Sequence, residues 1–568
     1  MLFIKISSRL AKLKYFLLVL SLILLIPFTL FPIISSSHLP IISDAWSATF
    51  YVDATKGNDS NSGLSPEIPW KTIAKVNTSR FNPGDQILFK RGEMWREMLK
   101  VPSPGTEQKS IAFGAYGVGD LPVITALDRM QVWELETGHV YKAKGPSRLP
   151  RVLVLDEVLG NRRTTKADLS SNGDWYFDEA RALLFLYSEA EPGLRLIEIG
   201  QRDYCIQDNN AGYITVESLK LSGANCAWGG AIDIRGTAGP WTVRNCFVTN
   251  SNSNGITLVN SGSLLFGNVI SHVGNYGIHI HPECNNSLVA KNEISYCHAG
   301  IEILGKSNIF ETNLIHHNDW NGIYLEGRPS RVSSADYNIV RYNRIYNNGF
   351  SAVFGDETNG AEIYNAGADY NKFNYNLIYD GSSKYACGIW FDFGSSYNQI
   401  YNNTIYSMKS LERGYGLTIE NGGEGGSSVG NDFKNNIITD CRIQLAVAND
   451  IQLDLQNNVF DFNCYHPGSE GYAIYDGTDR QLKTLSEWKA SHPASNAQSI
   501  SSDPQFVDLT IRNFALKTSS PCRNVGTNVG LNRDFEGNNV PKEGKVDMGV
   551  FQHKLLSPVR NLRTLPFE

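Results

Sequence analysis

Acidic, histidine and aromatic residues recur at two positions of a short motif that repeats through the middle of the chain. The motif is a glycine followed by apolar residues at alternate positions, and Gly277-Ile278-His279-Ile280 is one copy. Because successive side chains of a strand point to opposite faces, we expect the isoleucines inside and His279 outside. The first row of outward residues is then Asp233, Thr257, His279, Glu302, Tyr324, Phe354, Trp390 and Thr418. The second row is Arg235, Val259, His281, Leu304, Glu326, Asp356, Asp392 and Glu420.

Carboxylates in these rows could cleave a glycosidic bond. Hydrolysis needs one carboxylic acid to protonate the leaving oxygen and a second carboxylate to act as nucleophile or base. If the rows cross neighbouring strands about 4.8 Å apart, pairs one or two strands apart supply both separations that glycosidases use. The candidate catalytic carboxylates are Glu302, Glu326, Asp356 and Asp392.

The same surface could instead catalyse β-elimination from a uronic acid. That reaction needs the substrate carboxylate to be neutralised, often by Ca²⁺ held by acidic side chains, and a base that removes a proton. His279 and His281 point the same way from one strand and are candidate catalytic residues. The candidate Ca²⁺ ligands are Asp356, Asp392 and Glu420, and no other cofactor is expected.

Aromatic and basic residues near the carboxylates are candidates for substrate binding. We expect Tyr324 and Trp390 to be exposed, so that they can stack on the apolar faces of sugar rings. Lys306, Arg328 and Arg331 could neutralise or hold the substrate. An ordinary solvated face is the alternative, but adjacent acidic residues repel one another unless a cation or raised pKa values relieve the repulsion.

The elements that position these residues are predicted to be the coils of a solenoid. A second strand begins near a recurrent asparagine, and Asn268, Asn292 and Asn313 lie 24 and 21 residues apart. This repeat length with period-two alternation is typical of one coil of a parallel β-helix. We expect the asparagines to adopt left-handed backbone conformations and to bond to the asparagine of the next coil. The predicted fold is all-β, a right-handed parallel β-helix of about ten coils.

Longer gaps after Asn313 indicate insertions into turns. The gap from Asn343 to Asn376 is 33 residues. Insertions on consecutive coils are expected to build a wall along one side of the solenoid, where clefts form. The alignment of the two rows depends on the coil at Phe354, where Ala352 replaces the glycine.

The flanking segments resemble those of a known family. A strand at Tyr51-Val52-Asp53 runs into an Asn/Gly-rich turn, and a short amphipathic helix and another strand follow. This arrangement is similar to the N-terminal cap of extracellular right-handed parallel β-helix proteins of the pectate-lyase-like superfamily. The segments that carry the resemblance are 51–63, 70–76, 84–89, 503–506, 519–521 and 546–551. It implies the fold and a polysaccharide partner, but the family includes lyases, hydrolases and members without assigned activity.

Five parts are predicted along the chain. Apolar runs on either side of Glu179 indicate an antiparallel hairpin within a small β insertion. The parts are a signal peptide or membrane anchor (1–47), an N-terminal cap and first coils (48–124), the β insertion (125–205), regular coils (206–465), and a C-terminal coil and closing segment (466–568).

The first segment predicts export. Basic residues precede an apolar run at 15–34, and Ala45-Trp46-Ser47 fits a cleavage site. The run is also long enough to span a bilayer, so a retained anchor remains open. Either way the chain is expected to be secreted or extracytoplasmic, touching a membrane only through this segment.

Charge and cysteine content exclude other classes. The net charge of −6 and the lack of basic runs after the first fifteen residues argue against a nucleic-acid partner. Nine irregularly spaced cysteines predict neither a disulfide framework nor a zinc site. Cys205, Cys226 and Cys246 lie one coil apart, so stacked half-buried thiols and a disulfide between coils both remain open. We expect a monomer.

Three functions stay in competition. The leading one is cleavage of glycosidic bonds in an extracellular polysaccharide, by hydrolysis or β-elimination. The alternatives are a non-catalytic carbohydrate-binding or surface-structural β-helix, and a C5-epimerase, which shares proton abstraction with lyases but breaks no glycosidic bond.

Overall fold

The computed structural model describes residues 48–349, 360–410, 412–420, 426–447, 457–468, 473–492, 497–542 and 544–553. All described residues fall in one compact unit, Trp46–Glu568. The predicted signal or anchor segment (1–47) and Asp356 lie outside the described residues. Within the described ranges, no helix has the length and hydrophobicity needed to cross a bilayer.

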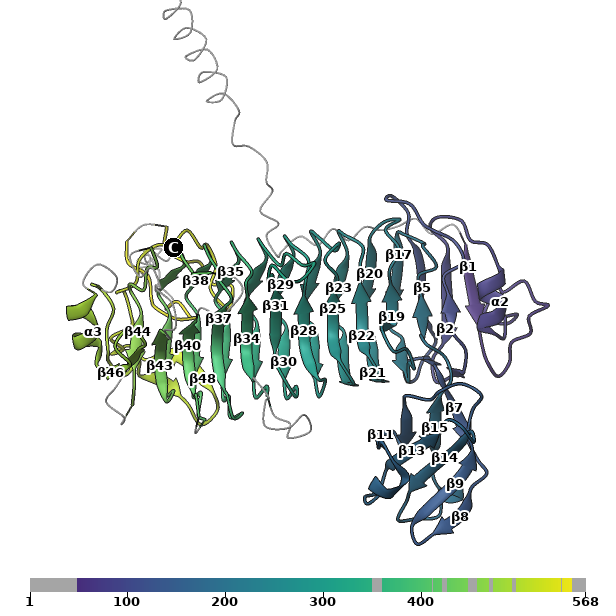
Figure 1. Ribbon diagram of the computed structural model, residues 1–568. Coiled ribbons are helices and arrows are strands. Elements are labelled where there is room, and N and C mark those ends of the chain that lie inside the picture. Colours follow the sequence, from purple (N-terminus) through teal and green to yellow (C-terminus); the bar gives the residue numbers. More distant parts are fainter. Residues whose placement is uncertain are drawn as a thin grey trace, which may run out of the picture. The chain divides into compact units, whose positions relative to one another are not determined.

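Three long parallel sheets form the solenoid (Figure 1). We name them S1 (13 strands), S2 (12 strands) and S3 (12 strands), in the order in which a coil visits them. One coil runs through β25 (Tyr276–Ile280) in S1, β26 (Leu288–Ala290) in S2 and β27 (Glu293–Ser295) in S3. The other strands of S1 are β4 (Leu99–Lys100), β16 (Ile206–Gln207), β19 (Gly230–Ile234), β22 (Asn254–Leu258), β28 (Ala299–Ile303), β31 (Ile323–Glu326), β34 (Ala361–Ala366), β37 (Cys387–Asp392), β40 (Tyr415–Ile419), β43 (Ile443–Val447), β45 (Ile474–Asp476) and β46 (Gln481–Lys483). The predicted all-β parallel β-helix is confirmed.

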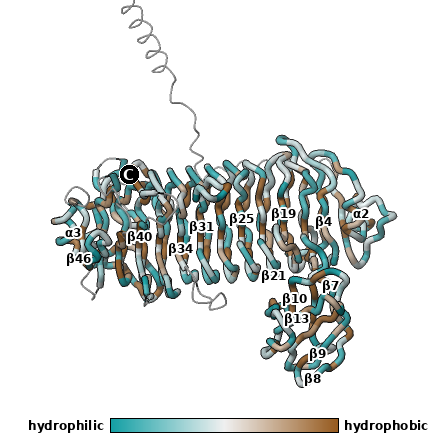
Figure 2. The backbone as a smooth tube through the Cα atoms, in the orientation of Figure 1, coloured by the Kyte–Doolittle hydropathy of each residue, from teal (hydrophilic) through white to brown (hydrophobic). Residues whose placement is uncertain are grey.

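The isoleucines of the repeated motif fill the core. Ile256, Ile278, Ile301 and Ile323 pair in register along S1, and each is fully buried. Figure 2 shows hydrophobic segments alternating with hydrophilic turns from coil to coil. Burying one such side chain contributes roughly 1.5–3 kcal/mol, so the motif stabilises every coil that contains it.

Asparagines between S2 and S3 form a hydrogen-bonded ladder. Asn292 Nδ2 donates to Asn313 Oδ1 at 3.1 Å, and Asn313 Nδ2 donates to Asn343 Oδ1 at 3.0 Å. This confirms the predicted bonding between coils. The left-handed conformation, however, falls on the preceding residue, as at Lys291 (φ 56°) and Thr312 (φ 54°). The prediction that these asparagines adopt it is wrong, because the preceding residue makes the turn while the asparagine aims its amide at the next coil.

One coil departs from the predicted alignment. β34 pairs with β31 on one side and β37 on the other. Tyr364 therefore holds the first-row position predicted for Phe354, and Ala366 holds the second-row position predicted for Asp356. The reason is a longer connection from S3 to S1: the S1 isoleucine follows its ladder asparagine by 20 residues here, against 10 in the preceding coil.

The segment after the first coils forms two small sheets. One has the order β11 (Val158–Leu159), β10 (Leu153–Leu155), β15 (Ile197–Gly200), β7 (Leu127–Met130). The other has the order β12 (Asn161–Arg162), β13 (Asp174–Asp178), β14 (Leu183–Tyr187), β9 (Val140–Lys144), β8 (Glu134–Thr137). The hairpin expected around Glu179 is β13 paired antiparallel with β14. Trp175, Leu184 and Leu186 are fully buried in a core of this segment's own.

A strand and a short helix form the N-terminal cap. β1 (Thr49–Val52) extends S2, and α2 (Ile73–Thr78) begins at Thr72, whose hydroxyl accepts a hydrogen bond from Lys75 N at 3.1 Å. Ile73 and Val76 of this helix are fully buried in the main core. They close the end of the hydrophobic interior.

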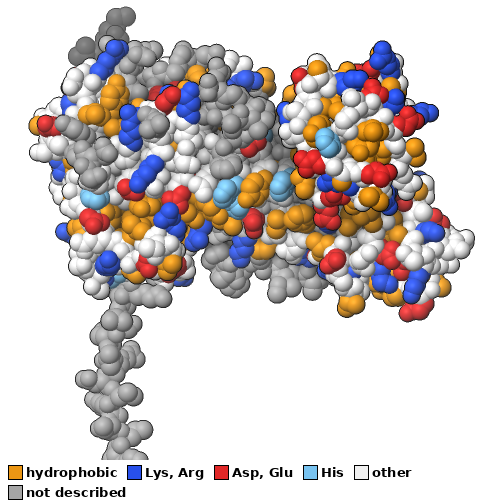
Figure 3. All heavy atoms as spheres, turned by 90° about the horizontal axis from the view of Figure 1, so that it is seen from below, with side chains coloured by type: hydrophobic (Ala, Val, Ile, Leu, Met, Phe, Trp, Pro, Cys, Tyr) orange, Lys and Arg blue, Asp and Glu red, His pale blue; other side chains and the backbone are white. Residues whose placement is uncertain are grey.

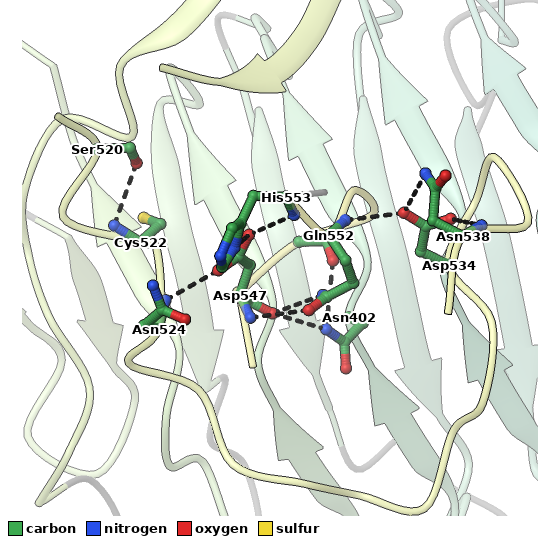
Figure 4. A network of polar contacts seen from close by, with 10 residues as sticks. Asn402, Ser520, Cys522, Asn524, Asp534, Asn538, Asp547, Gln552 and His553 are labelled. Carbon is green, nitrogen blue, oxygen red and sulfur yellow. Dashed lines mark hydrogen bonds and ion pairs between the residues drawn. The ribbon is translucent and has the colours of Figure 1, made fainter. Parts of the chain in front are cut away.

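The opposite end of the interior is covered by α3 (Leu485–Ser491), whose Leu485 and Trp488 join the main core. The pair β47 (Phe506–Asp508) and β48 (Asn513–Leu516) and a polar network (Figure 4) pack on the outside of the coils. Asp547 accepts hydrogen bonds from Asn524 N at 2.8 Å and from His553 N at 2.7 Å. Asn402 Nδ2 of the solenoid donates to the carbonyl of Asp547 at 3.1 Å. The closing segment is therefore attached to the coils by main-chain bonds as well as by apolar packing.

Candidate active site

The outer face of S1 carries a row of polar and aromatic side chains. Strand pairing aligns His279 with Glu302, Glu302 with Tyr324, and Tyr324 with Tyr364. Trp390 and Thr418 continue the row. The pairing is the predicted one except at Tyr364.

A cleft of about 290 Å³ opens on this row. Two carboxylates, Glu302 and Glu326, lie in it, and the turn after β31 supplies one side. The lining residues are Tyr276, Glu302, Leu304, Trp320, Tyr324, Glu326, Arg328, Arg331, Val332 and Ser333. The turn thus acts as the wall that insertions after Asn313 were expected to build.

Glu302 is held by a histidine from the neighbouring coil. Its Oε2 lies 2.6 Å from His279 Nδ1, and the carboxylate is 8% exposed. Tyr276 packs against the His279 ring at 5.9 Å between centroids. Burial and the charge of Glu302 raise the pKa of Tyr276, so its phenol stays protonated and can donate a hydrogen bond to Glu302. His279 Nδ1 and Glu302 Oε2 are therefore within hydrogen-bonding distance at the edge of the cleft.

Glu326 lies in a different electrostatic environment. Arg328 binds it with both ends of its guanidinium, Nε to Oε1 at 2.8 Å and Nη2 to Oε2 at 2.5 Å, and the Tyr324 hydroxyl donates to it as well. Burial opposes ionisation of Glu326, but these hydrogen bonds outweigh it and hold its pKa below the usual value. Glu326 is therefore an anion at neutral pH.

The two carboxylates are diagonal neighbours on adjacent strands. Glu302 pairs with Tyr324, and Glu326 follows Tyr324 by two residues. Diagonal neighbours have Cα atoms about 7–8 Å apart, which leaves room for a glycosidic oxygen between the side chains. The two carboxyl groups therefore lie in different environments, one against a histidine and one held ionised by an arginine, as acid/base pairs of glycosidases do.

The predicted sugar platforms are not exposed. Tyr324 and Trp390 are each only 4% exposed, because each packs against Tyr364, with ring centroids 5.4 Å and 4.6 Å away. Tyr324 still lines the cleft, whereas Trp390 does not. Trp320 is partly exposed, lines the cleft and stacks on His298 at 5.7 Å. It is the ring better placed to meet a sugar.

The remaining candidates lie outside the cleft or at its rim. Arg331 is exposed and lines the cleft, whereas Lys306 is exposed on the turn after β28 and does not line it. The His281 ring lies 6.3 Å from His279. Burial and the neighbouring His279 lower the pKa of His281, so it is neutral at neutral pH.

The predicted Ca²⁺ ligands are not assembled in the described part of the chain. Asp392 accepts a hydrogen bond from Tyr364 at 3.4 Å, and Glu420 binds Arg413 at 3.0 Å. Among the described residues, no three His, Cys, Asp or Glu side chains are grouped so as to hold a metal ion. Asp356, the third predicted ligand, lies outside them, so the Ca²⁺ site stays a prediction.

Residue patterns do contain signals for the side chains that were missed. Tyr276 directly precedes the Gly277 motif, and Trp320 lies two residues before Gly322, but only positions after the glycine were aligned. Tyr364 could have been found from the pair Ile363-Tyr364, which repeats the pair Ile323-Tyr324.

Comparisons with known proteins support the fold. Residues 230–405 match the family described as right handed beta helix region. The solved complex of XylC with xylose superposes with a TM-score of 0.62 at 15% identity, covering 89% of this chain and 98% of that one. A glycoside hydrolase structure has a TM-score of 0.53 at 12% identity, covering 66% of this chain and 97% of that one.

One curated relative is similar over a short stretch. Lacto-N-biosidase of Bifidobacterium longum subsp. longum is 36% identical over 118 residues, which make up 19% of this chain. The matched stretch spans 7% of the length of that relative. The strand pairing of S1, S2 and S3 and the family match over 230–405 together show that the chain has a right-handed parallel β-helix fold.

Proposed function

We propose that the cleft on S1 hydrolyses a glycosidic bond in a neutral saccharide, with Glu302 as proton donor and Glu326 as nucleophile or base. The supporting observation is that two carboxylates with different environments line one cleft. Arg328 keeps Glu326 ionised, whereas Glu302 contacts His279 and the protonated phenol of Tyr276. This division matches the needs of glycoside hydrolysis.

In the proposed reaction the proton of Glu302 goes to the glycosidic oxygen as the C–O bond breaks. Water supplies a hydroxyl group to the anomeric carbon, either directly with Glu326 as base or after a glycosyl ester with Glu326. The other proton of the water returns to the carboxylates. The anomer of the first product distinguishes the two routes, because the direct route inverts the anomeric centre and the ester route retains it.

A neutral saccharide is favoured over a uronic acid because the half-buried arginine of the cleft is already paired, although Arg331 lies exposed at the rim. Arg328, which contacts Glu326, is already neutralised by it. Seen from below, the molecule carries basic and acidic side chains interspersed over its surface (Figure 3). The similarity to lacto-N-biosidase supports a saccharide substrate.

The decisive experiment incubates the purified full chain with neutral and acidic oligosaccharides, in Ca²⁺ and in chelator. We expect new reducing ends from a neutral substrate, unchanged by chelator and without the ultraviolet absorbance of an unsaturated uronate. Absorbance with an acidic substrate would overturn hydrolysis in favour of β-elimination, for which neutral His281 would be the base. Retention of the protein in a polysaccharide gel without any product would favour the alternative of a non-catalytic carbohydrate-binding protein.

A matched pair of variants ties the activity to the cleft. Glu302→Gln is expected to lower turnover by about 10²–10⁴-fold, the usual contribution of a general acid. The control is Glu311→Gln, which breaks a comparable ion pair with Arg341 (2.7 Å) on S2, outside the cleft. Full activity of Glu302→Gln would place the chemistry elsewhere.

We also propose that the protein works outside the cytoplasm and as a monomer. The support is the basic and apolar character of residues 1–34. Cell fractionation of the native host, with N-terminal sequencing, would show whether that segment is removed. Light scattering on the purified chain would test the monomer.

A further inference from the structure

Two buried cysteines meet where the closing segment docks on the solenoid. Cys464 begins β44 (Cys464–His466), a strand of S3, and Cys522 lies after β48. Both side chains are fully buried in one apolar cluster that also contains Phe506, Phe514 and Met548. Figure 4 shows Cys522 on the segment that leads to Asn524 and its bond with Asp547.

The two cysteines lie in the same buried cluster, and main-chain bonds hold each one in place. The proximity of Cys464 raises the pKa of the Cys522 thiol. Cys464 Sγ also lies 3.2 Å from the carbonyl oxygen of Ser502. On the solenoid side, Cys464 N donates to Asn436 O at 2.8 Å, and on the other side Met548 N donates to Cys522 O at 2.9 Å. Two thiols brought together by the fold meet the first requirement of a disulfide.

The cysteines spaced one coil apart have different partners. Cys205 Sγ donates to the carbonyl of Ser222 at 3.3 Å, and Cys246 Sγ donates to that of Arg244 at 3.5 Å. Burial raises the pKa of each of these thiols to about 12. They are satisfied by backbone oxygens, as stacked buried thiols would be.

We propose that Cys464 and Cys522 form a disulfide that ties the closing segment to the solenoid when the chain folds with a disulfide oxidant such as oxidised glutathione. One cysteine thiolate attacks oxidised glutathione, forms a mixed disulfide and releases one glutathione thiolate. The second cysteine thiolate attacks the protein sulfur of that bond and releases the other glutathione. Two protein thiols are oxidised, losing two protons and two electrons, and one glutathione disulfide is reduced to two thiols.

The bond is expected to form during folding. In the docked segment, contact with Cys464 and burial raise the pKa of Cys522, so almost no thiolate is present. Oxidant must therefore act before the segment closes over the pair. The loop between the two positions spans 58 residues, and closing a loop of this length restricts the unfolded chain strongly.

Refolding under two redox conditions tests the proposal. The full chain is unfolded in reductant and refolded either with oxidised glutathione or with reduced glutathione alone. After alkylation in denaturant, peptide mass mapping of the oxidised sample should show the Cys464 and Cys522 peptides joined, two hydrogen masses below their sum. The other seven of the nine cysteines should be alkylated. Alkylation of both Cys464 and Cys522 in that sample, or their pairing with other cysteines, would overturn the proposal.

Variants test the role of the bond. Oxidised wild-type chain should melt at a higher temperature than reduced chain, and Cys464→Ser or Cys522→Ala should abolish that difference. Cys205→Ser is the control, because it removes another buried thiol and should leave the difference intact. Equal melting temperatures of oxidised and reduced wild type would refute the stabilising role. If one of the two cysteine variants fails to fold, the melting temperature of the other variant and the peptide map of the oxidised wild type test the proposal.

Discussion

The two halves of the S1 row contain the same kinds of side chain in different surroundings. In the cleft half, Glu302 and Glu326 border an open space of about 290 Å³. In the packed half, around Trp390 and Glu420, rings and a guanidinium cover one another, with Arg413 4.5 Å from the Trp390 ring centre. Carboxylates beside aromatic rings therefore do not by themselves identify a reactive site. The proposed site is distinguished by the open cleft beside its carboxylates.

The charges of the two halves differ as well. Arg328 donates hydrogen bonds to both carboxylate oxygens of Glu326, and these keep the pKa of that carboxyl low. Glu420 receives a hydrogen bond from Arg413, and burial outweighs it, so the pKa of Glu420 is raised. An arginine neighbour holds a buried carboxylate ionised only when its hydrogen bonds offset the cost of desolvation.

The largest expected effect is a loss of activity on substitution in the cleft half of the S1 row but not in the packed half. Glu302→Gln and Glu326→Gln should each lower turnover by about 10²–10⁴-fold, because each removes an acid/base group from the cleft. Asp392→Asn and Glu420→Gln in the packed half should stay within a few-fold of wild type. Initial rates on the cleaved saccharide, with circular dichroism to verify folding, measure both. A loss at Asp392→Asn as large as that at Glu302→Gln would move the site.

Aromatic substitutions should separate binding from packing. Trp390→Ala should lower stability by about 3–5 kcal/mol, as removal of a buried large side chain does, with little change in KM. Trp320→Ala should raise KM several-fold and leave the melting temperature closer to wild type, because its ring is partly exposed in the cleft. Thermal melts and Michaelis–Menten kinetics are the measurements. The reverse pattern would show that the sugar binds in the packed half.

Replacing Arg328 and Arg413 one at a time tests the electrostatic difference between the two halves of the row. Without Arg328, burial is no longer offset and the pKa of Glu326 rises. Because Glu326 must be ionised, the acidic limb of the rate–pH profile should move to higher pH, by about one unit or more. Arg413→Ala should leave that limb in place. An unshifted profile for Arg328→Ala would exclude Glu326 as the group that must be ionised.

A final effect, on stability alone, concerns a buried acid on the same strand as Tyr364. Glu362 is fully buried, accepts a hydrogen bond from Asn348 N at 3.1 Å, and has its pKa raised to about 8 by burial. A raised folded-state pKa means that stability is fully present below the unfolded carboxyl pKa, about 4.3, and is lost as pH rises through about 8. The melting temperature of Glu362→Gln minus that of the wild type should therefore increase between pH 5 and pH 9. A pH-independent difference would contradict this.

The fold and most of the row could be predicted from local patterns. The Gly-Ile motif places Ile278 inside and His279 outside without reference to distant parts, and the spacing of Asn292 and Asn313 sets the coil length. Phe354 was predicted at the row position that Tyr364 holds, because a turn insertion leaves no periodic signal for where the strand resumes. The burial of Trp390 could not be foreseen either, since it depends on Tyr364 in the neighbouring coil.

The sequence by itself determined the solenoid, the inward isoleucines, the asparagine ladder and the alignment of His279 with Glu302, because each follows from a period of two or from the repeat length. Only the tertiary structure decided which carboxylates border a cleft, that Arg328 pairs with Glu326, and that Cys464 meets Cys522. Those features arise where turns of irregular length and the closing segment return to the coils. Such contacts join residues far apart in the chain, so no local period can encode them.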